Sequence, residues 1–142
     1  TWMAVSSDLG HETDVHPRNK RPVGQRLAFQ ALRHSFGRSL VAEGPKFLSM
    51  KVKGSAIFVN FAEAEGLQTA DGKELRGFEV AGEDGIFYPA TTEILGTQIK
   101  VTAKDVQSPV SVRYAWKPFT DANLVNAARI PASTFKAEIA KP

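Results

Sequence analysis

Residues 47–61 have the sequence FLSMKVKGSAIFVNF, and this stretch decides how the larger part of the chain folds. It contains two runs rich in aliphatic and aromatic residues, Phe47–Lys53 and Ala56–Phe61. Gly54 lies between them. Short runs with β-forming side chains, divided by a glycine, are typical of strands. We therefore predict two strands here.

The same pattern continues toward the C-terminus. Asp71-Gly72 and residues 82–85 (Gly-Glu-Asp-Gly) have the composition of hairpin turns. Further strands are expected at Phe78–Val80, Ile86–Tyr88, Glu93–Leu95, Gln98–Thr102 and Val110–Tyr114. Many short strands with glycine-rich turns predict an antiparallel sandwich or barrel. Residues 117–142 have little periodicity and three prolines, the last of them Pro142, so this tail is expected to wrap the surface.

The first 38 residues have a different pattern, which predicts a strand, a loop and a helix. Trp2–Val5 is a short apolar run consistent with a buried strand. Pro17 suits the first turn of the following helix, where a missing N–H is tolerated. A single strand–helix unit cannot bury both faces of its strand. We therefore expect this piece to complete a larger α/β domain whose other strands lie elsewhere.

The helix itself is expected to run from Lys20 or Val23 to Phe36, with Gly37 as its C-terminal cap. Apolar side chains recur along it at helical spacing, and we expect them to form one apolar face. These side chains are Val23, Leu27, Ala28, Ala31, Leu32 and Phe36.

The 142 residues are 42% hydrophobic and 23% charged, as in ordinary globular proteins, and contain no cysteine. The absence of cysteine excludes disulfides and thiolate metal sites. No apolar run approaches the roughly 20 residues of a membrane-spanning helix. We divide the chain into residues 1–42, a piece of an α/β domain, and residues 43–142, a β-sandwich segment with an irregular tail.

The net charge of +3 is concentrated in one segment, because residues 15–42 contain no acidic side chain. Such a segment could bind nucleic acid. The simpler interpretation is a solvated helix face, with cations toward the end that the helix dipole favours. Aromatic residues do not alternate with the basic ones as they do in single-strand binders. We therefore expect neither a nucleic-acid nor a membrane partner.

The clearest candidate for chemistry is the polar loop from Glu12 to His16. A histidine accepts and returns a proton near neutral pH, and a carboxylate beside it fixes the tautomer that does so. Asp14 or Glu12 could supply that carboxylate. The alternative is a surface histidine that precedes a helix. A metal cluster of His11, His16 and the loop carboxylates has no fixed ligand spacing, so we expect no metal.

The chain lacks a nucleophile to accompany this loop. The sequence contains neither Gly-x-Ser-x-Gly nor Gly-Asp-Ser, and no serine is followed by evident oxyanion donors. The loop is therefore expected to be half of an active site.

Short motifs spread over nearly the whole chain occur in the order found in one enzyme family. They are Met3–Val5, Asp8–Gly10, Asp14–Lys20, Val23–Ala28, Gly72–Gly85, Phe87–Ala90, Val112–Trp116, Asn123–Asn126 and Ile130–Phe135. Taken together they resemble the C-terminal region of the sialate O-acetylesterases, which are SGNH-type carbohydrate esterases.

This resemblance implies a serine esterase that removes acetyl groups from sialic acid or related sugars, with no metal or organic cofactor. Its fold would be a flavodoxin-like α/β hydrolase domain followed by a jelly-roll-like antiparallel β-sandwich. The histidine of the family's His-Pro motif, its catalytic base, matches His16. The serine lies far upstream in that family, so this chain would be a fragment or processed subunit that needs a serine-bearing segment. A periplasmic, secreted or lysosomal compartment is implied as well.

The chain departs from the SGNH pattern at one position. The acid of that pattern stands three residues before the histidine, where this chain has Thr13. Asp14 is our choice for the acid, with Glu12 and Asp8 as alternatives.

A second hypothesis assigns the chain to a different class, a carbohydrate-binding or assembly module without catalytic activity. Aromatic side chains of the β-rich part would then stack on a glycan, although they could equally belong to the core. The candidates are Tyr88, Tyr114, Trp116 and Phe119.

Overall fold

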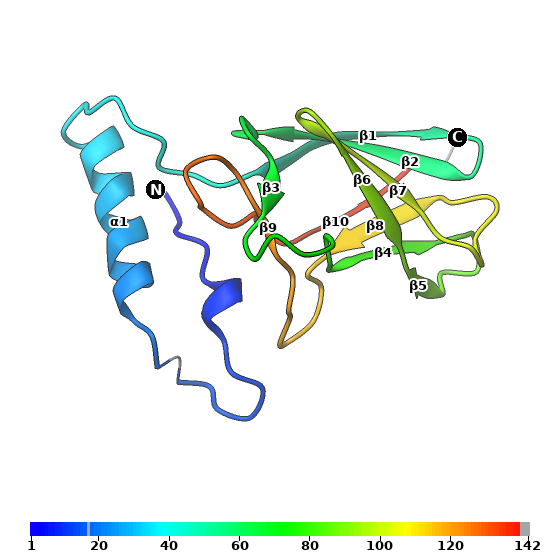
Figure 1. The fold of residues 1–142 in the computed structure, drawn as a ribbon, viewed down its shortest axis with the longest axis horizontal. Coiled ribbons are helices and arrows are strands. Elements are labelled where there is room, and N and C mark those ends of the chain that lie inside the picture. The colour runs from blue at the N-terminus through cyan, green and yellow to red at the C-terminus, as the bar shows by residue number, and fades with distance from the viewer. Residues whose placement is uncertain (17, 140–142) are drawn as a thin grey trace.

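The computed structural model describes residues 1–16 and 18–139. Its N-terminal part holds a short 3₁₀ turn, Ser7–Leu9, and one α-helix, α1 (Arg21–His34). Figure 1 shows α1 at one end of the molecule and the β-sheets at the other. No helix within the described ranges is long and apolar enough to cross a membrane.

All the strands lie C-terminal to α1. They are β1 (Lys46–Lys53), β2 (Ala56–Ala62), β3 (Gln68–Thr69), β4 (Phe78–Ala81), β5 (Phe87–Pro89), β6 (Thr91–Leu95), β7 (Gln98–Thr102), β8 (Ser111–Tyr114), β9 (Leu124–Val125) and β10 (Phe135–Glu138).

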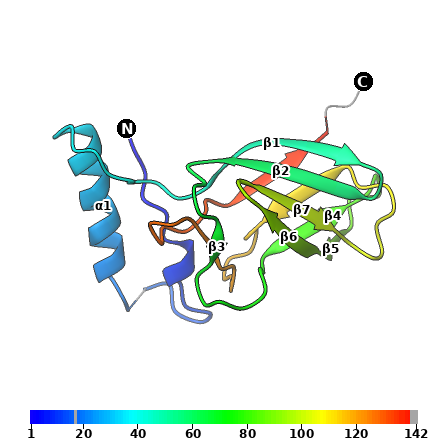
Figure 2. The same cartoon turned by 45° about the horizontal axis from the view of Figure 1, so that its top comes forward.

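The strands form three sheets in which every pairing is antiparallel. Two have four strands each, in the orders β1-β2-β7-β6 and β10-β8-β4-β5, and β3 pairs with β9 in a small third sheet. The two larger sheets lie one over the other, as Figure 2 shows from a second direction. Their facing side chains form one apolar core.

The alternation along the strands explains this core. In β2, Ile57, Val59 and Phe61 point inward and are buried, as the two-residue period of a strand requires. Val80 on β4 pairs with Val112 on β8, the neighbouring strand of the second sheet, and both are buried. The core is therefore specified by residues that sequence periodicity identifies.

The strands predicted between residues 47 and 61 are confirmed as β1 and β2. Lys53 pairs with Ala56, and Gly54 between them has φ +58°, as the first position of a type II′ turn requires. The hairpin predicted at residues 82–85 is also confirmed, because β4 pairs with β5.

Two other predictions about the β region are wrong. Asp71-Gly72 lies in a turn, but β3 before it pairs with β9, so the turn does not close a hairpin. The tail does more than wrap the surface, because it supplies β9 and β10. Phe135 on β10 is buried against Phe47, with ring centroids 4.9 Å apart. Pro142 lies outside the described residues.

The predicted fold class, a flavodoxin-like α/β hydrolase piece followed by a jelly-roll-like sandwich, is wrong for this chain. The described residues form antiparallel sheets with one α-helix and include no strand at Trp2–Val5. A strand must pair its backbone groups, and no neighbouring strand is present to do so. Instead, the carbonyl of Val5 accepts a hydrogen bond of 2.8 Å from Arg26, and that of Met3 one of 3.4 Å from Gln30.

The predicted helix exists, and within this chain it packs through its polar side chains. Its C-terminal cap is confirmed, since Gly37 has φ +63° and the next residue, Arg38, donates its N–H to the carbonyl of Leu32. Polar Arg26 and Gln30 are its buried side chains. The predicted apolar face is exposed instead, with Leu27 53% accessible. Pro17, expected in the first turn, lies outside the described residues.

Candidate functional site

The structure brings Asp14 and His16 together in the loop before α1. Asp14 Oδ1 lies 3.1 Å from His16 Nδ1, and it also accepts the backbone N–H of His16 at 2.9 Å. An aspartate that accepts the N–H two residues ahead forms a compact local turn. This turn folds the imidazole back onto the carboxylate, so the spacing of the two residues alone produces the contact.

This contact has a chemical consequence. When Nδ1 carries its hydrogen and donates it to Asp14, Nε2 is left as the basic nitrogen, the arrangement required of a general base. The His16 side chain is 82% exposed, so Nε2 is accessible from outside the chain. The pair resembles the base-and-acid part of a hydrolytic triad in its geometry.

The other candidate acids differ from Asp14. Asp8 is paired with Arg26 of α1 through two hydrogen bonds of 2.7 Å each, one to each carboxylate oxygen. This bidentate pair attaches the Ser7–Leu9 turn to the helix. Glu12 has no hydrogen bond to His16 within the part of the chain that the structure describes. Asp14 is thus the carboxylate that the fold supplies.

The structural role of Asp8 and Arg26 could not be found by motif analysis. Arg26 stands in the middle of a helix among apolar residues, and the periodicity of those residues does not indicate which side chains α1 packs through. The only available signal was that a long basic side chain inside an amphipathic helix can reach a carboxylate on a neighbouring loop.

The remaining histidines have separate contacts. His11 Nδ1 accepts the backbone N–H of Thr13 at 3.3 Å, away from His16. His34 in α1 stacks on Trp2, with centroids 4.2 Å apart and planes within 7° of each other. Across residues 1–16 and 18–139, no three His, Asp or Glu side chains gather as metal ligands would.

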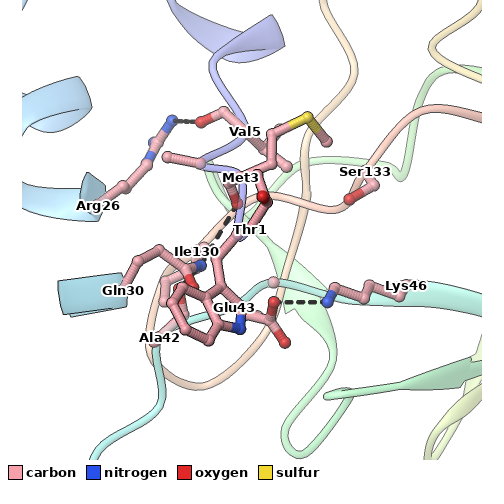
Figure 3. Close-up of a pocket in the computed structure, with 13 residues that line it drawn as sticks. Thr1, Met3, Val5, Arg26, Gln30, Ala42, Glu43, Lys46, Ile130 and Ser133 are labelled. Carbon is pink, nitrogen blue, oxygen red and sulfur yellow. Dashed lines mark hydrogen bonds and ion pairs between the residues drawn. The ribbon is translucent and has the colours of Figure 1, made fainter. Parts of the chain in front are cut away.

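A cavity of about 240 Å³ lies between the N-terminal segment, α1 and the start of β1. Figure 3 shows Arg26 and Gln30 reaching from α1 toward the backbone of this segment, and the ion pair between Glu43 and Lys46 on the other side. Gln30 Nε2 also donates to the carbonyl of Ala42 at 2.9 Å. Polar side chains of α1 thus bind the backbone of the segment before the helix and of the segment after it, and these contacts hold the walls of the cavity together.

The four aromatic candidates divide into two groups. Tyr114 is a core residue whose hydroxyl oxygen accepts the N–H of Leu124 at 2.9 Å, and its burial raises the pKa of the phenol above its usual value. Tyr88 is half-buried and packs against the core. Trp116 and Phe119, in the loop after β8, are exposed. Only the second group is available to a ligand.

Fold and site together define an antiparallel β-sandwich protein that carries an exposed aspartate–histidine pair on an N-terminal loop. Neither models of known protein families nor curated proteins give a match to the sequence. Among solved structures, the chain is similar to XAC1771, a carbohydrate acetylesterase from Xanthomonas citri. The two share 39% sequence identity over 96% of this chain, with a TM-score of 0.91. The chain spans about a third of that protein, 32% of its length.

Proposed function

We propose that this chain is part of a serine carbohydrate esterase that removes O-acetyl groups from sialic acid or a related acetylated sugar. His16 is its general base and Asp14 the carboxylate that orients it. The observation that carries the proposal is the 3.1 Å contact between Asp14 Oδ1 and His16 Nδ1. The similarity to a carbohydrate acetylesterase over 96% of the chain supports the reaction class.

In the proposed reaction, the serine is supplied by a segment outside these 142 residues. His16 Nε2 takes the proton of the serine hydroxyl while its oxygen attacks the ester carbonyl. His16 then protonates the sugar oxygen of the ester as its bond to the acyl carbon breaks, which releases the sugar hydroxyl and leaves an acetyl-enzyme. It next takes a proton from water, which attacks the acetyl carbonyl. Acetate leaves, and the proton returns to the serine.

The exposed face of α1 supports the need for such a segment. Leu27, Leu32 and Phe36 are 53%, 39% and 72% accessible. Contiguous apolar surface on a helix is usually covered by another element. We propose that the serine-bearing segment packs on this face, which would place its hydroxyl beside the loop that precedes the helix.

The test is to combine the chain with a serine-bearing segment and assay hydrolysis of an aryl acetate. We expect His16→Ala to lower kcat/KM by about 10²-fold to 10⁴-fold, the contribution of a positioned general base. His11→Ala is the matched control, because His11 lies in the same loop with a different partner. A His16→Ala enzyme within a few-fold of the parent would exclude the assignment.

The non-catalytic alternative predicts a different result in the same experiment. A carbohydrate-binding or assembly module would bind glycan through its exposed aromatic side chains, and hydrolysis would not increase when the serine-bearing segment is added.

A further inference from the structure

A groove of about 300 Å³ opens beside the loop that follows β8. Trp116 and Phe119 line it, with 49% and 41% of their surfaces accessible. A second hollow of about 340 Å³ lies against Trp116 and Thr134. Trp116 is thus accessible from two sides. A volume of this size is at the lower end of small-molecule sites.

The loop is held in this shape by backbone features rather than by apolar packing of its own. Ala115 has φ +52°, in the left-handed region that residues other than glycine rarely adopt. Its N–H donates to the carbonyl of Gly77 at 2.9 Å. A Cβ on Gly77 would lie 2.6 Å from the Cβ of Ala122, so only glycine permits the loop to pack this closely. Strained backbone of this kind is frequent at ligand sites.

Polar side chains line the same groove. Asp121 is fixed by a hydrogen bond of 3.0 Å from Arg76 Nε to its carboxylate. Glu79 accepts a hydrogen bond of 2.8 Å from Arg113 and lies 3.8 Å from Lys117 Nζ. Each carboxylate is therefore oriented by a cation and keeps acceptor capacity for further donors.

Aromatic faces with oriented carboxylates beside them match the chemistry of a sugar. A pyranose ring has faces of C–H groups, which pack on aromatic rings, and an edge of hydroxyls, which donate to carboxylates. A purely apolar ligand would donate no hydrogen bond to Glu79 or Asp121.

The groove lies next to the candidate catalytic loop. A Cβ at Gly10 would lie 3.8 Å from Cδ2 of Phe119, so the two loops are in contact. Figures 1 and 2 both place the loop after β8 beside the Ser7–Leu9 turn. Gly10 is six residues before His16 in the same loop.

We propose that Trp116 and Phe119 form a stacking wall that binds the sugar ring of the substrate, with Glu79 and Asp121 accepting its hydroxyls. This inference rests on the proposed function for its substrate. The existence of the binding site is inferred from the groove and its lining residues, independently of the catalytic assignment.

The deciding experiment is a titration followed by the indole N–H signals in NMR spectra of the chain. The chain has two tryptophans, so Trp116→Phe assigns both signals. The probes are cellohexaose, which is neutral, and 3′-sialyllactose, which is acidic. We expect one of them to shift the Trp116 signal with millimolar affinity, about −4 kcal/mol, while the Trp2 signal stays in place. The probe that binds identifies the kind of sugar.

Matched variants complete this titration. Phe119→Ala should weaken the affinity roughly tenfold, and Ile86→Ala, which removes an exposed side chain on the β4–β5 hairpin, should not. A Trp116 signal that stays fixed with both sugars up to about 20 mM overturns the proposal. Equal shifts of both tryptophans overturn it as well.

A second readout uses the enzyme combined with its serine-bearing segment. The ratio of kcat/KM for an acetylated oligosaccharide to kcat/KM for an aryl acetate should fall roughly tenfold in Trp116→Ala. It should stay constant in Ile86→Ala. An unchanged ratio in Trp116→Ala contradicts the stacking wall. If the parent hydrolyses neither ester, the proposed function fails, and the NMR titration still decides the sugar site.

Discussion

Asp71 connects the segment of residues 71–76 with Asn123 through one side chain. Its Oδ2 accepts a hydrogen bond of 2.8 Å from Arg76, and its Oδ1 accepts bonds from Asn123 and from the N–H of Lys73 at 2.8 and 3.2 Å. The hydrogen bond from Arg76 is the main cause that holds the pKa of this carboxyl below its usual range. The ionised form therefore stabilises the fold, and Asp71 couples stability to pH.

The sign of this coupling follows from the two states. An aspartate in the unfolded chain titrates near pH 3.9, whereas folded Asp71 titrates lower. Its contribution is full above about pH 4 and is lost as the pH falls toward the folded pKa. Urea denaturation of the parent and Asp71→Asn should therefore differ most near pH 7. The difference should narrow between about pH 4 and pH 2.

Arg76→Gln provides the control for this prediction. Because the hydrogen bond from Arg76 is the largest cause of the lowered pKa of Asp71, the pH dependence of the Asp71→Asn effect should be smaller in that background. A difference between parent and Asp71→Asn that is the same at pH 7 and pH 3 would contradict this account.

At the same scale, sequence reasoning identified the Asp14–His16 pair because the interaction is local. A carboxylate two residues before a histidine can reach it whatever the rest of the fold does. It could not find the ion pair of Asp8 with Arg26, or the stacking of His34 on Trp2. Both join segments at least 18 residues apart and depend on how α1 lies against the N-terminal segment.

Among the elements, β10 shows what a weak local pattern can conceal. Its residues alternate between apolar and polar over only four positions, Phe135–Glu138, and it pairs with β8 along all of them. The Phe135 ring lies at the centre of an aromatic cluster, with centroids 4.9 Å from Phe47, 5.7 Å from Phe61 and 6.2 Å from Tyr114. An alternation this short does not distinguish a strand from the rest of the tail, and the contacts of Phe135 with distant residues are not visible in the sequence.

Truncating that anchor should destabilise the whole sandwich. We expect Phe135→Ala to lower the free energy of unfolding by about 3–5 kcal/mol, the usual effect of removing a buried phenylalanine. Phe36→Ala is the matched control, since that ring is exposed beyond the end of α1 and should change stability by less than about 0.5 kcal/mol. Equal effects of the two substitutions in urea denaturation would show that β10 does not anchor the core.

Helix α1 illustrates a clear local pattern that leaves the packing open. The apolar spacing correctly predicted a helix, and Gly37 correctly marked its end. The pattern did not show that within this chain α1 packs through Arg26 and Gln30 and leaves most of its apolar face exposed. Periodicity identifies which residues share a face, but it does not identify the chain that covers that face.

For the whole molecule, the same reasoning explains why the fold class was mistaken. The strands of residues 46–114 depend on turns and alternation within short windows, so they were predictable. An α/β domain needs several strands. That fold class was predicted from the family resemblance, which refers to segments outside these 142 residues. The described residues therefore fold as an antiparallel sandwich with a helix attached at one end.

The attachment of α1 leads to a prediction about the assembled molecule. Within the chain, polar contacts hold the helix, with ion pairs of 2.7 Å from Arg26 to Asp8 and 3.4 Å from Arg33 to Glu63. Elements with little buried apolar surface open more easily than a core. By hydrogen exchange, amides of Arg21–His34 should exchange faster than those of β2 and β8.

Addition of the serine-bearing segment should change this pattern. If that segment covers Leu27 and Leu32, the amides of α1 become protected, because their opening then requires the loss of an apolar interface. Leu27→Lys should abolish the gain in protection, since it places a charge inside that interface. Leu48→Lys, on the exposed side of β1, should leave it intact. Full protection of α1 in the chain alone, or equal loss with either lysine, would mean that this face is not where the two parts of the enzyme meet.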